Sequence, residues 1–525
     1  MNFILKRVIS LTLERSAYLL VAMLIALNAN AQNYGNFPYE EGFKSSVRPT
    51  AVSIPSVSSG TNSAAFTGDG LRLTSAGQSQ FGAVFVNNLQ FKTINGIKIE
   101  FEYMIYGGEA VNNADGISLF LFDASIDNPT IGTKGAGLGY AFNRANNNYS
   151  NLRLPGLTGG YLGVGFDNYG NFKSVRFQGD SRVNGLSDGN TLGNSHVTLR
   201  GAKGAVDSSY KGADTDGYSG YPVLISQSTR TPSLNRRINV SNGQYSSFTS
   251  SIDTNETFSL RGGGSFSDGQ TGNAAYRKAI VELYPWVDSD DNTILGKLVT
   301  VKIQVGTKLV TVIQNFQYPV QLTYVENSYS NLANGDMSTS DGTSRNVSKV
   351  LNSKAPEYIR IGFAASTGAY FDNHYIKNLK ITLPSAAIAV DDEVQTSLNK
   401  SVDIYPFTND TGFTGAIKPD QIGNSSYLNP FSFQFIDSSG NPLNGYSYTT
   451  SEGTWIYDPD TSRVTFTPAL NYQGEATIKY NIKAGLGGEE PYRDEAYRSL
   501  PAAITVLVTS PQAIVTNLML QPSIR

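Results

Sequence analysis

The sequence predicts an all-β protein made of two sandwiches, because strand-like runs recur along it and helical periodicity is essentially missing. In Gly82–Val86 and Ile97–Tyr103, apolar and polar residues alternate with a period of two. Gly, Asn, Asp and Ser bound these runs, which is the pattern of half-buried strands joined by turns. The 52 Gly, 30 Tyr and 26 Phe residues fit a turn-rich sheet protein with aromatic contact patches.

Residues 1–31 have the pattern of a secretory signal peptide. Basic residues (Lys6, Arg7, Arg15) precede the apolar run Ala17–Leu27, and the sequence Ala-Asn-Ala that ends at Ala31 supplies a cleavage site. The alternative is a membrane anchor, but the run is well short of the roughly 20 apolar residues that a spanning helix needs. No other stretch is apolar enough to cross a bilayer. We therefore expect cleavage after Ala31 and a secreted or cell-surface protein.

Composition excludes several classes of function. The chain has no cysteine, so disulfides and thiolate metal sites or nucleophiles are excluded, which suits an exported bacterial protein. The formal net charge of −3 disfavours binding to nucleic acid or anionic membranes, which calls for clustered Lys and Arg. With 525 residues, the chain has room for two or three domains and a large core.

The stretch Gly159–Phe172 joins an apolar strand to an oxygen-rich loop. Asp167, Tyr169 and Asn171 stand there at positions i, i+2 and i+4. A carboxylate, a main-chain carbonyl and an amide oxygen at this spacing can converge on one hard cation, and calcium accepts roughly six to eight oxygens in irregular geometry. The alternative is an unliganded turn closed by the Asp and Asn side chains. The loop therefore predicts half of a Ca²⁺ site.

Residues 201–275 are polar and rich in Gly, Ser, Asp and Asn, with few apolar runs. This stretch is longer than a structureless loop should be inside a compact domain. We interpret it as a surface insertion, which either widens a binding face or is simply tolerated. Strands are expected again at Lys278–Leu283, Leu298–Val305, Val310–Ile313 and Ile359–Ala364.

After Pro384 and Ser385 the strand pattern restarts, which indicates a second unit over residues 386–510. Its V-D-D, N-D, T-P-x-x-N-Y-x-G and T-V-x-V sequences resemble the ends of cadherin-like or immunoglobulin-like repeats of bacterial adhesins; they lie in Ala389–Glu393, Asn409–Asp410, Thr467–Gly474 and Ile504–Val508. The resemblance implies a smaller β-sandwich that acts as a spacer. The tail 511–525 resembles neither a membrane span nor a sorting domain.

Four segments of the first unit resemble, in order, the legume-type (L-type) lectin domain, a concanavalin A-like jelly roll. They are Asn112–Phe122 with its Ala-Asp-Gly, the Gly-rich turn Gly135–Gly139, the loop in Gly159–Phe172, and Tyr358–Leu383 with its closing strand. The resemblance covers about residues 33–385. It implies an exported calcium-dependent carbohydrate-binding protein, a cell-surface adhesin or glycan-capture module, with glycans or polysaccharide as partners.

The resemblance implies a role for each residue of the sugar site. Asp115 corresponds to the family's Asp whose carboxylate accepts from two adjacent sugar hydroxyls, and the peptide bond before it is cis in the family. The Tyr169 ring would stack on the sugar, and the Asn171 amide would donate to a hydroxyl. Ala136 and Gly137 of the Gly-rich turn would line the sugar, with a backbone N–H from Ala136, where the family usually has Gly.

The resemblance also implies the calcium ligands. They would be the side chains of Asp167 and Asn171 and the main-chain carbonyl of Tyr169. The family's second bridging Asp corresponds to Asp180 or Asp188, and no spacing decides between them.

A neighbouring transition-metal site is not expected. Gly165 stands where the family has a Glu that binds this metal, although His196 lies near the family's metal-binding His. Losing the Glu removes a hard anionic ligand from a site that needs carboxylate, imidazole and water. We expect calcium alone, and His196 is more simply interpreted as a strand residue.

Two rival functions differ in class from sugar binding. A glycoside hydrolase on the same jelly roll would need two catalytic carboxylates, and the nearest acid pair, Glu100 and Glu102, shares a strand face without a third acid. Nucleophilic catalysis is poorly supported, since the chain has no cysteine and its two histidines are His196 and His374. We expect no enzyme. The remaining alternative is a structural surface protein without sugar binding.

Overall fold

The structure is a computed structural model that describes residues 34–57, 60–108, 115–142, 154–173, 195–205, 219–231, 235–250, 252–262, 272–329, 344–413, 423–485 and 494–510. The expected signal peptide and the tail 511–525 lie outside these ranges. The described residues contain strands, turns and short 3-10 helices but no α-helix; the 3-10 helices are Gly135–Gly137, Thr254–Glu256, Pro406–Thr408, Ser425–Tyr427 and Glu495–Tyr497. Within them, nothing helical is long and apolar enough to span a membrane.

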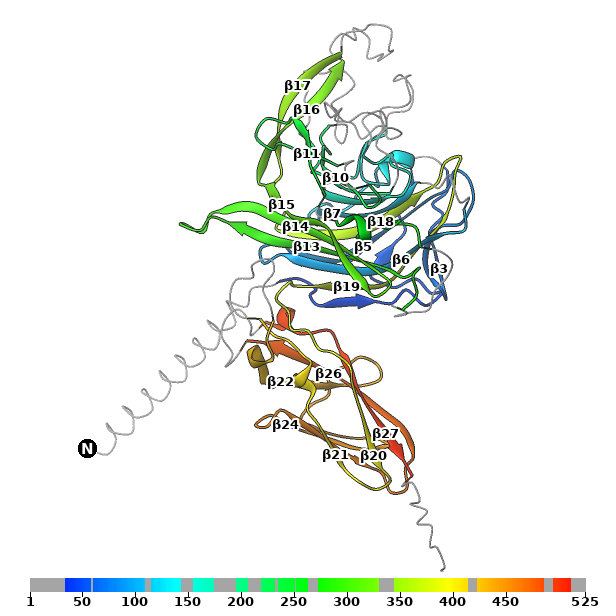
Figure 1. The fold of residues 1–525 in the computed structure, drawn as a ribbon, viewed down its shortest axis with the longest axis vertical. Coiled ribbons are helices and arrows are strands. Elements are labelled where there is room, and N and C mark those ends of the chain that lie inside the picture. Colours follow the sequence, from blue (N-terminus) through cyan, green and yellow to red (C-terminus); the bar gives the residue numbers. More distant parts are fainter. Residues whose placement is uncertain are drawn as a thin grey trace, which may run out of the picture.

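The strands up to residue Thr382, apart from β16 and β17, form two large antiparallel sheets. These sheets are the layers in the upper part of Figure 1. The first has eight strands in the order β15-β14-β13-β6-β19-β4-β3, with β1 also paired to β19. Their bounds are β1 Tyr39–Glu41, β3 Ala65–Thr67, β4 Gly70–Thr74, β6 Ile97–Tyr106, β13 Arg277–Val287, β14 Ile294–Val305, β15 Lys308–Pro319 and β19 Asn373–Thr382.

The second large sheet has nine strands in the order β12-β11-β10-β9-β8-β7-β18-β5-β2. Their bounds are β2 Val52–Ser53, β5 Phe81–Lys92, β7 Gly116–Asp123, β8 Gly160–Asp167, β9 His196–Arg200, β10 Val223–Ser228, β11 Arg236–Ile238, β12 Tyr245–Ser247 and β18 Tyr358–Ser366. A separate hairpin pairs β16 Gln321–Tyr329 with β17 Ser344–Asn352.

The two large sheets enclose one apolar core. Alternate residues of each strand point into it, as period two requires. Phe101 of β6 contacts Phe166 of β8 and Phe363 of β18, with ring centroids 5.6 and 5.0 Å apart. The predicted fold class is therefore confirmed: the protein is all-β, and its first unit is a jelly-roll sandwich.

A second, smaller core lies on the outer face of the nine-stranded sheet. Residues 131–142 fold over this face, and their Tyr140 packs against Phe120 and Tyr221. A Cβ built on Gly163 would lie 2.4 Å from the Tyr140 ring, so only glycine leaves room for it. The Tyr140 hydroxyl donates to the Gly201 carbonyl oxygen at 2.8 Å. These contacts hold the Gly-rich turn over β7 and β8.

Part of the stretch expected to be a surface insertion belongs to the sheet. Val223, Leu224 and Ile225 of β10 are buried, and β10 pairs with β9 in antiparallel register. Strands β11 and β12 then extend the sheet further. A short apolar run inside the polar stretch thus forms β10, which extends the sheet beyond β9.

The strands from Asp392 onward form a smaller sandwich, in the lower part of Figure 1. One four-stranded sheet has the order β20-β27-β26-β22 and the other β21-β25-β24-β23. Their bounds are β20 Asp392–Ser397, β21 Val402–Ile404, β22 Leu428–Ile436, β23 Ser447–Thr449, β24 Gly453–Asp458, β25 Arg463–Pro468, β26 Gly474–Ala484 and β27 Ala502–Thr509. Buried rings of Trp455, Phe466, Phe433 and Tyr480 fill the space between them.

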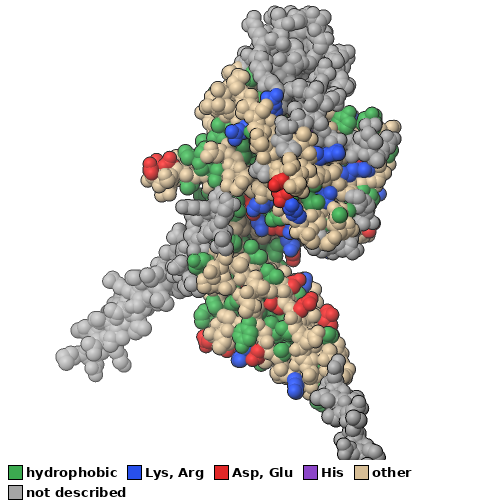
Figure 2. All heavy atoms as spheres, viewed as in Figure 1, with side chains coloured by type: hydrophobic (Ala, Val, Ile, Leu, Met, Phe, Trp, Pro, Cys, Tyr) green, Lys and Arg blue, Asp and Glu red, His purple; other side chains and the backbone are tan. Residues whose placement is uncertain are grey.

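Charged side chains are dispersed on the surface. On the face drawn in Figure 2, Lys and Arg side chains of the described residues lie scattered among polar and apolar ones rather than in one basic patch.

Candidate functional site

Asp167 closes strand β8 and organises the loop that follows. It lies opposite Gly116 of β7 and His196 of β9 in the sheet register, and its side chain is fully buried. Its Oδ1 accepts a hydrogen bond from the Gly170 N–H at 2.8 Å, and its Oδ2 accepts one from the Lys173 N–H at 3.1 Å. The loop is therefore curled around this carboxylate, as the Asp-x-Tyr-x-Asn spacing suggests.

Asp115 ties the start of β7 to two neighbouring segments. Its N–H donates to the Ser366 carbonyl oxygen at 2.7 Å, and its own carbonyl oxygen accepts from the Tyr169 N–H at 2.9 Å. The side chain is only 5% exposed, and its Oδ2 has no hydrogen-bond partner among the described residues. The predicted cis bond involves Ala114, which lies outside the described residues.

Burial and charge act together on the Asp115 carboxyl. Its pKa rises to about 7, first because the group is buried and second because Asp167 is nearby, while the Ser366 hydroxyl partly offsets the rise. Each effect disfavours the ionised form. A ligand that donates hydrogen bonds to this carboxylate would relieve that cost.

The Gly-rich turn reaches the same place through Ser366. The Gly135 N–H donates to the Ser366 hydroxyl oxygen at 2.8 Å, and the Ser118 hydroxyl donates to the Leu138 carbonyl oxygen at 2.5 Å. Ala136 is buried. A Cβ on Gly137 would lie 2.0 Å from Thr133 Oγ1, so the turn needs glycine there. The four segments singled out in the sequence thus meet around Asp115 and Ser366.

Two tyrosine rings, those of Tyr169 and Tyr370, lie near Asp115. Tyr169 and Tyr370 are both partly exposed, and their ring centroids lie 5.9 Å apart at an interplanar angle of 34°. Burial, then Tyr370, then Asp115 raise the pKa of Tyr169, so the Asp115 carboxyl lies close to it. Asn171 is half-buried at the end of the same loop. The sequence analysis missed Tyr370, although it lies within the segment Tyr358–Leu383.

An ion pair between Arg261 and Asp372 contacts the loop through Asn168. The Asp372 carboxylate, fully buried, accepts from the Arg261 guanidinium at 2.8 Å and from the Gly108 N–H at 2.8 Å. Its other oxygen accepts a long bond of 3.5 Å from the Asn168 side-chain amide. Arg261 also donates to the Gly108 carbonyl oxygen at 2.7 Å. This network fixes the residue that follows Asp167.

The space beside Gly165 is filled by an aromatic ring, which an arginine contacts in turn. A Cβ on Gly165 would lie 2.2 Å from Phe172 Cδ1, so the Phe172 ring takes the space that a Glu side chain would need. The buried Arg200 guanidinium lies 5.0 Å from the Phe172 ring centroid and donates to the Phe172 carbonyl oxygen at 2.8 and 2.6 Å. His196 lies beside this region and is buried.

The loop partly fits a calcium ion. Asp167, the Tyr169 carbonyl and Asn171 are oxygen donors on one curled loop, which is the chemistry that calcium takes. Asp180 and Asp188 lie outside the described residues, and within the described ranges no group of three or more His, Asp or Glu side chains is arranged to hold a metal.

A lysine lies in the same loop. The Lys173 side chain is fully buried and its ammonium donates to the Gly170 carbonyl oxygen at 3.1 Å. Burial raises the pKa of Asp167, whereas Lys173, the two loop amides and Arg200 lower it. Burial in turn lowers the pKa of Lys173 to about 8, against the effect of Asp167. The loop thus contains positive charge of its own, which the sequence analysis missed although Lys173 follows Asp167 by only six residues.

Glu100, Glu102 and His374 are each held by ion pairs or hydrogen bonds within the protein. Burial alone would raise the pKa of Glu100, but Lys98 and Lys278, ion-paired to it at 2.5 and 3.6 Å, lower it to about 2. Glu102 accepts from the Tyr276 hydroxyl at 2.9 Å. His374 is fully buried, its Nδ1 is 2.6 Å from the Thr74 hydroxyl, and burial lowers its pKa to about 3.

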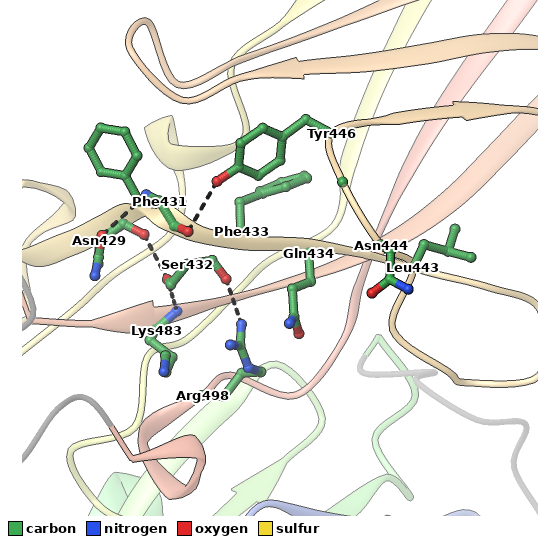
Figure 3. A pocket seen from close by; sticks show the side chains of 11 residues that line it. Asn429, Phe431, Ser432, Phe433, Gln434, Leu443, Asn444, Tyr446, Lys483 and Arg498 are labelled. Atoms are coloured by element: carbon green, nitrogen blue, oxygen red, sulfur yellow. Dashed lines mark hydrogen bonds between the residues drawn. The ribbon is translucent and has the colours of Figure 1, made fainter. Parts of the chain in front are cut away.

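An open groove of about 490 Å³ lies elsewhere, on the second sandwich (Figure 3). Its cations are already paired: Lys483 contacts Glu495 at 2.9 Å, and Arg498 contacts Glu495 at 2.5 Å and donates to the Ser432 carbonyl oxygen. Of the charged groups in this wall, none is left to recognise a ligand by charge. The site residues expected from the sequence lie on the other sandwich, so the groove is not the candidate site.

Comparisons with known proteins give distant similarities of structure. No family model and no curated protein matches the chain. Among the solved structures that match is the VIP36 exoplasmic/lumenal domain in a Ca²⁺/Man3GlcNAc-bound form. It is 13% identical to this chain with a TM-score of 0.29, and the match covers 64% of this chain and 86% of that one. They also include lectin I-B4 from Griffonia simplicifolia in a metal-free form, at 13% identity and 0.30, covering 66% and 99%. A lectin from Bauhinia forficata in complex with GalNAc matches at 13% and 0.28, covering 66% and 97%. Scores this low neither assign a family nor transfer a ligand.

Proposed function

We propose that the first sandwich binds carbohydrate at Asp115. The observation that carries the proposal is the buried Oδ2 of Asp115, which lacks a partner among the described residues and lies beside two partly exposed tyrosine rings. A buried carboxylate oxygen without a donor is costly, so a ligand that supplies hydroxyl groups would be favoured there. The order and spacing of the four L-type lectin-like segments support the same function.

The chemistry of a pyranose matches these groups. The Asp115 carboxylate accepts charge-assisted hydrogen bonds from two adjacent hydroxyls, and the apolar face of the ring stacks on Tyr169 and Tyr370. Asn171 donates its amide to a hydroxyl, and the turn at Ala136 and Gly137 supplies a backbone N–H. Recognition would thus read the relative stereochemistry of neighbouring hydroxyls.

Calcium is part of the proposal as a loop-ordering ion. Asp167, the Tyr169 carbonyl and Asn171 would hold it, with Asp180 or Asp188 as a further acid. Bound there, it would supply positive charge that offsets the repulsion between the carboxylates of Asp115 and Asp167. No second, transition-metal ion is proposed, because Phe172 occupies the space beside Gly165.

We propose binding without catalysis, in an exported protein. A general acid works best with a pKa near the operating pH, and the Glu100 pKa of about 2 is far below it. Release of reducing ends from a polysaccharide, abolished in Glu100→Gln, would overturn this part.

Residues 386–510 are proposed to form an independent spacer: as an isolated segment they should unfold cooperatively and bind no sugar.

A glycan array probed with the full chain, with and without calcium, tests the proposal. We expect binding to a defined set of glycans, followed by calorimetry on the best of them. Saturating calcium at about 100 times its dissociation constant would add roughly 2.7 kcal/mol of stability, so chelation should lower the melting temperature. Absence of glycan binding in both conditions would refute the carbohydrate site. An unchanged melting curve together with no calcium in metal analysis would refute the ion.

A further inference from the structure

Arg261 belongs to the polar stretch that we interpret as an insertion, and its backbone is held in place on both sides. Leu260 is fully buried, and its N–H donates to the Ser195 hydroxyl oxygen at 2.9 Å. Arg277, buried at the start of β13, donates to the carbonyl oxygens of Ser259 and Arg261 at 3.2 and 3.3 Å. The Arg261 side chain therefore starts from a fixed position, although the stretch that carries it has few apolar runs.

The Arg261 guanidinium joins separate loops. Its Nη2 donates to the Gly108 carbonyl oxygen at 2.7 Å and to Asp372 Oδ1 at 2.8 Å, and its Nε donates to the same Asp372 oxygen at 3.1 Å. The Gly108 N–H also donates to this oxygen, at 2.8 Å. Asp372 is fully buried, and its other oxygen accepts from the Asn168 side-chain amide at 3.5 Å. One guanidinium and one carboxylate thus connect three loops.

Each of these three loops carries a residue of the proposed sugar site. Tyr370 stands two residues before the buried aspartate, and Tyr169 directly follows Asn168. Asp115 comes seven residues after Gly108. Removing one partner of a buried ion pair is strongly destabilising, because the remaining charge is left without compensation. Loss of the guanidinium would therefore loosen the loops around the site at the point where all three meet.

We propose that Arg261 is a positioning residue of the sugar site. It acts through Asp372 and Gly108, and holds the Asp115 carboxylate and the two tyrosine rings in one arrangement before a sugar arrives. A site that is ordered in advance loses less free energy on binding than one that the ligand must order. The stretch 201–275 then contributes to the binding face, the first of the two roles considered for it. The inference rests on the proposed function in taking this place as the sugar site.

A lysine at this position could reproduce only part of the arrangement. A guanidinium presents its donors in a rigid planar fork, whereas an ammonium is a compact point charge on a flexible stem. Arg261 uses two nitrogens on one carboxylate oxygen and one of them on a carbonyl oxygen as well. Arg261→Lys keeps the charge and loses the fork, so it should restore part of what Arg261→Met removes.

Two substitutions at Arg261 test this role in the full chain, with Lys308→Met as a control. Lys308 forms an exposed ion pair with Glu256 of the same stretch, at 2.9 Å, so the control removes an ion pair that lies outside the site. Hydrogen exchange is followed at the Gly108 and Tyr169 amides, which are both hydrogen-bonded in the folded chain. Glycan affinity is measured by calorimetry at a temperature where all the proteins are folded.

A second control separates positioning from general stability. Val281→Ala removes buried apolar volume from β13, so it should lower the melting temperature without touching the loops. Arg261→Met should speed exchange at both amides about tenfold or more, because these loops open locally. Glycan affinity should fall about tenfold in this variant, which corresponds to about 1.4 kcal/mol. Arg261→Lys should lie between it and the wild type, and both controls should match the wild type in exchange and affinity.

The outcomes separate this inference from the proposed function. Unchanged exchange at both amides in Arg261→Met would overturn the inference, whether or not glycans bind. Faster exchange with an undiminished glycan affinity would overturn it too, because the site would then form without Arg261. If the wild type binds no glycan, the proposed function is refuted, and faster exchange in Arg261→Met but not in Val281→Ala would still support the positioning of these loops.

A variant that fails to fold does not leave the inference untested. Arg261→Met combined with Asp372→Asn leaves no buried charge unpaired, so this double variant replaces the single one if the latter does not fold. The same faster exchange and weaker glycan binding are expected from it. If the double variant also fails to fold, the inference is overturned, because Arg261 would then be required for folding itself.

Discussion

Each sandwich contains a pair of interacting aspartates, of which Asp392 is half-buried and the other three residues are buried, and the two pairs are satisfied in different ways. In the first sandwich, Lys173 and Arg200 lower the pKa of Asp167, yet Oδ2 of Asp115 has no hydrogen-bond partner among the described residues. In the second, Asp392 and Asp410 have no cation among the groups that shift their pKa values. The first pair combines compensating charge with an unmatched acceptor, whereas the second relies on hydrogen bonds alone.

The second pair is closed by Tyr480. Its hydroxyl lies 2.8 and 3.0 Å from the two oxygens of Asp410 and 3.3 Å from Asp392 Oδ2. The Val390 N–H donates to Asp410 Oδ1 at 2.8 Å, and the Asn409 side-chain amide donates to Asp392 Oδ1 at 3.1 Å. A hydroxyl carries one proton and cannot donate to three oxygens at once, so these carboxylate oxygens share a single donor. Burial, first among the causes, raises the pKa of Asp410 to about 7 and that of Asp392 to about 6.

The comparison separates a binding site from a structural cluster. Acidic residues, burial and raised pKa values are common to both pairs, so none of these properties identifies a ligand site. What differs is that one acceptor, Oδ2 of Asp115, has no partner among the described residues and lies near partly exposed aromatic rings. The predictions below act on this difference.

The largest effect is expected from Asp115→Asn. The substitution keeps the shape but replaces an acceptor oxygen with a donor and removes the charge that strengthens two hydrogen bonds, each worth about 1.5–3 kcal/mol. Partial loss of both should weaken glycan binding about 100-fold, at 1.4 kcal/mol per tenfold. Calorimetry measures this loss, and Asp392→Asn is the matched control, with unchanged affinity. A folded Asp115→Asn protein of undiminished affinity would place the sugar elsewhere.

Tyr480→Phe should act on stability alone. It removes the donor shared by Asp410 and Asp392 and leaves buried acceptors short of a partner, at a cost of about 1–3 kcal/mol. Urea unfolding of the full chain would report this change. Tyr472→Phe is the control, because the Tyr472 hydroxyl bonds to the Glu475 carbonyl oxygen in an exposed position. Equal losses in the two variants would contradict the role assigned to the buried hydroxyl.

The second sandwich should lose stability as the pH rises. Raised carboxyl pKa values mean that the folded chain binds these protons more tightly than the unfolded chain. Their stabilising contribution is complete below the ordinary pKa of 3.8 and is lost as the pH rises through about 6 and 7, the values of Asp392 and Asp410. Between pH 5 and pH 8 we expect Asp410 to lose up to about 2.7 kcal/mol, from about two pKa units at 1.36 kcal/mol per unit, and the half-buried Asp392 to add less because solvent screens it. Urea unfolding at both pH values, repeated with Asp410→Asn, would show a clearly smaller loss in the variant than in the wild type.

Tyr370→Leu should have the smallest effect. It keeps apolar bulk beside Tyr169 but removes an aromatic face, and aromatic contacts contribute about 0.5–1.5 kcal/mol beyond area burial. Glycan affinity should fall about threefold to tenfold, with no change in calcium affinity. An unaltered glycan affinity would show that Tyr169 alone forms the stacking surface.

The sequence was informative wherever one local pattern decides the structure. Period-two alternation predicted β6 and β18, whereas the calcium site expected from the Asp-x-Tyr-x-Asn spacing stays a prediction. Contacts between distant segments were not predictable in this way. Ser366 joins Asp115 to the Gly-rich turn, and Arg200 supports Phe172, but neither has a local signal. A lysine in a polar loop is normally solvated, so the burial of Lys173 depends on packing that the sequence does not show.

Parallel pairing of β20 with β27 has a mechanical consequence. Six register pairs join the strands, from Asp392 and Ile504 to Ser397 and Thr509. The chain enters β20 from the first sandwich and leaves β27 at the opposite end of the ladder. Tension between these two points pulls the strands along their length in opposite directions, so the hydrogen bonds are loaded together in shear instead of opening one after another. The second sandwich is therefore built to resist force along the line that connects the first sandwich to Thr509.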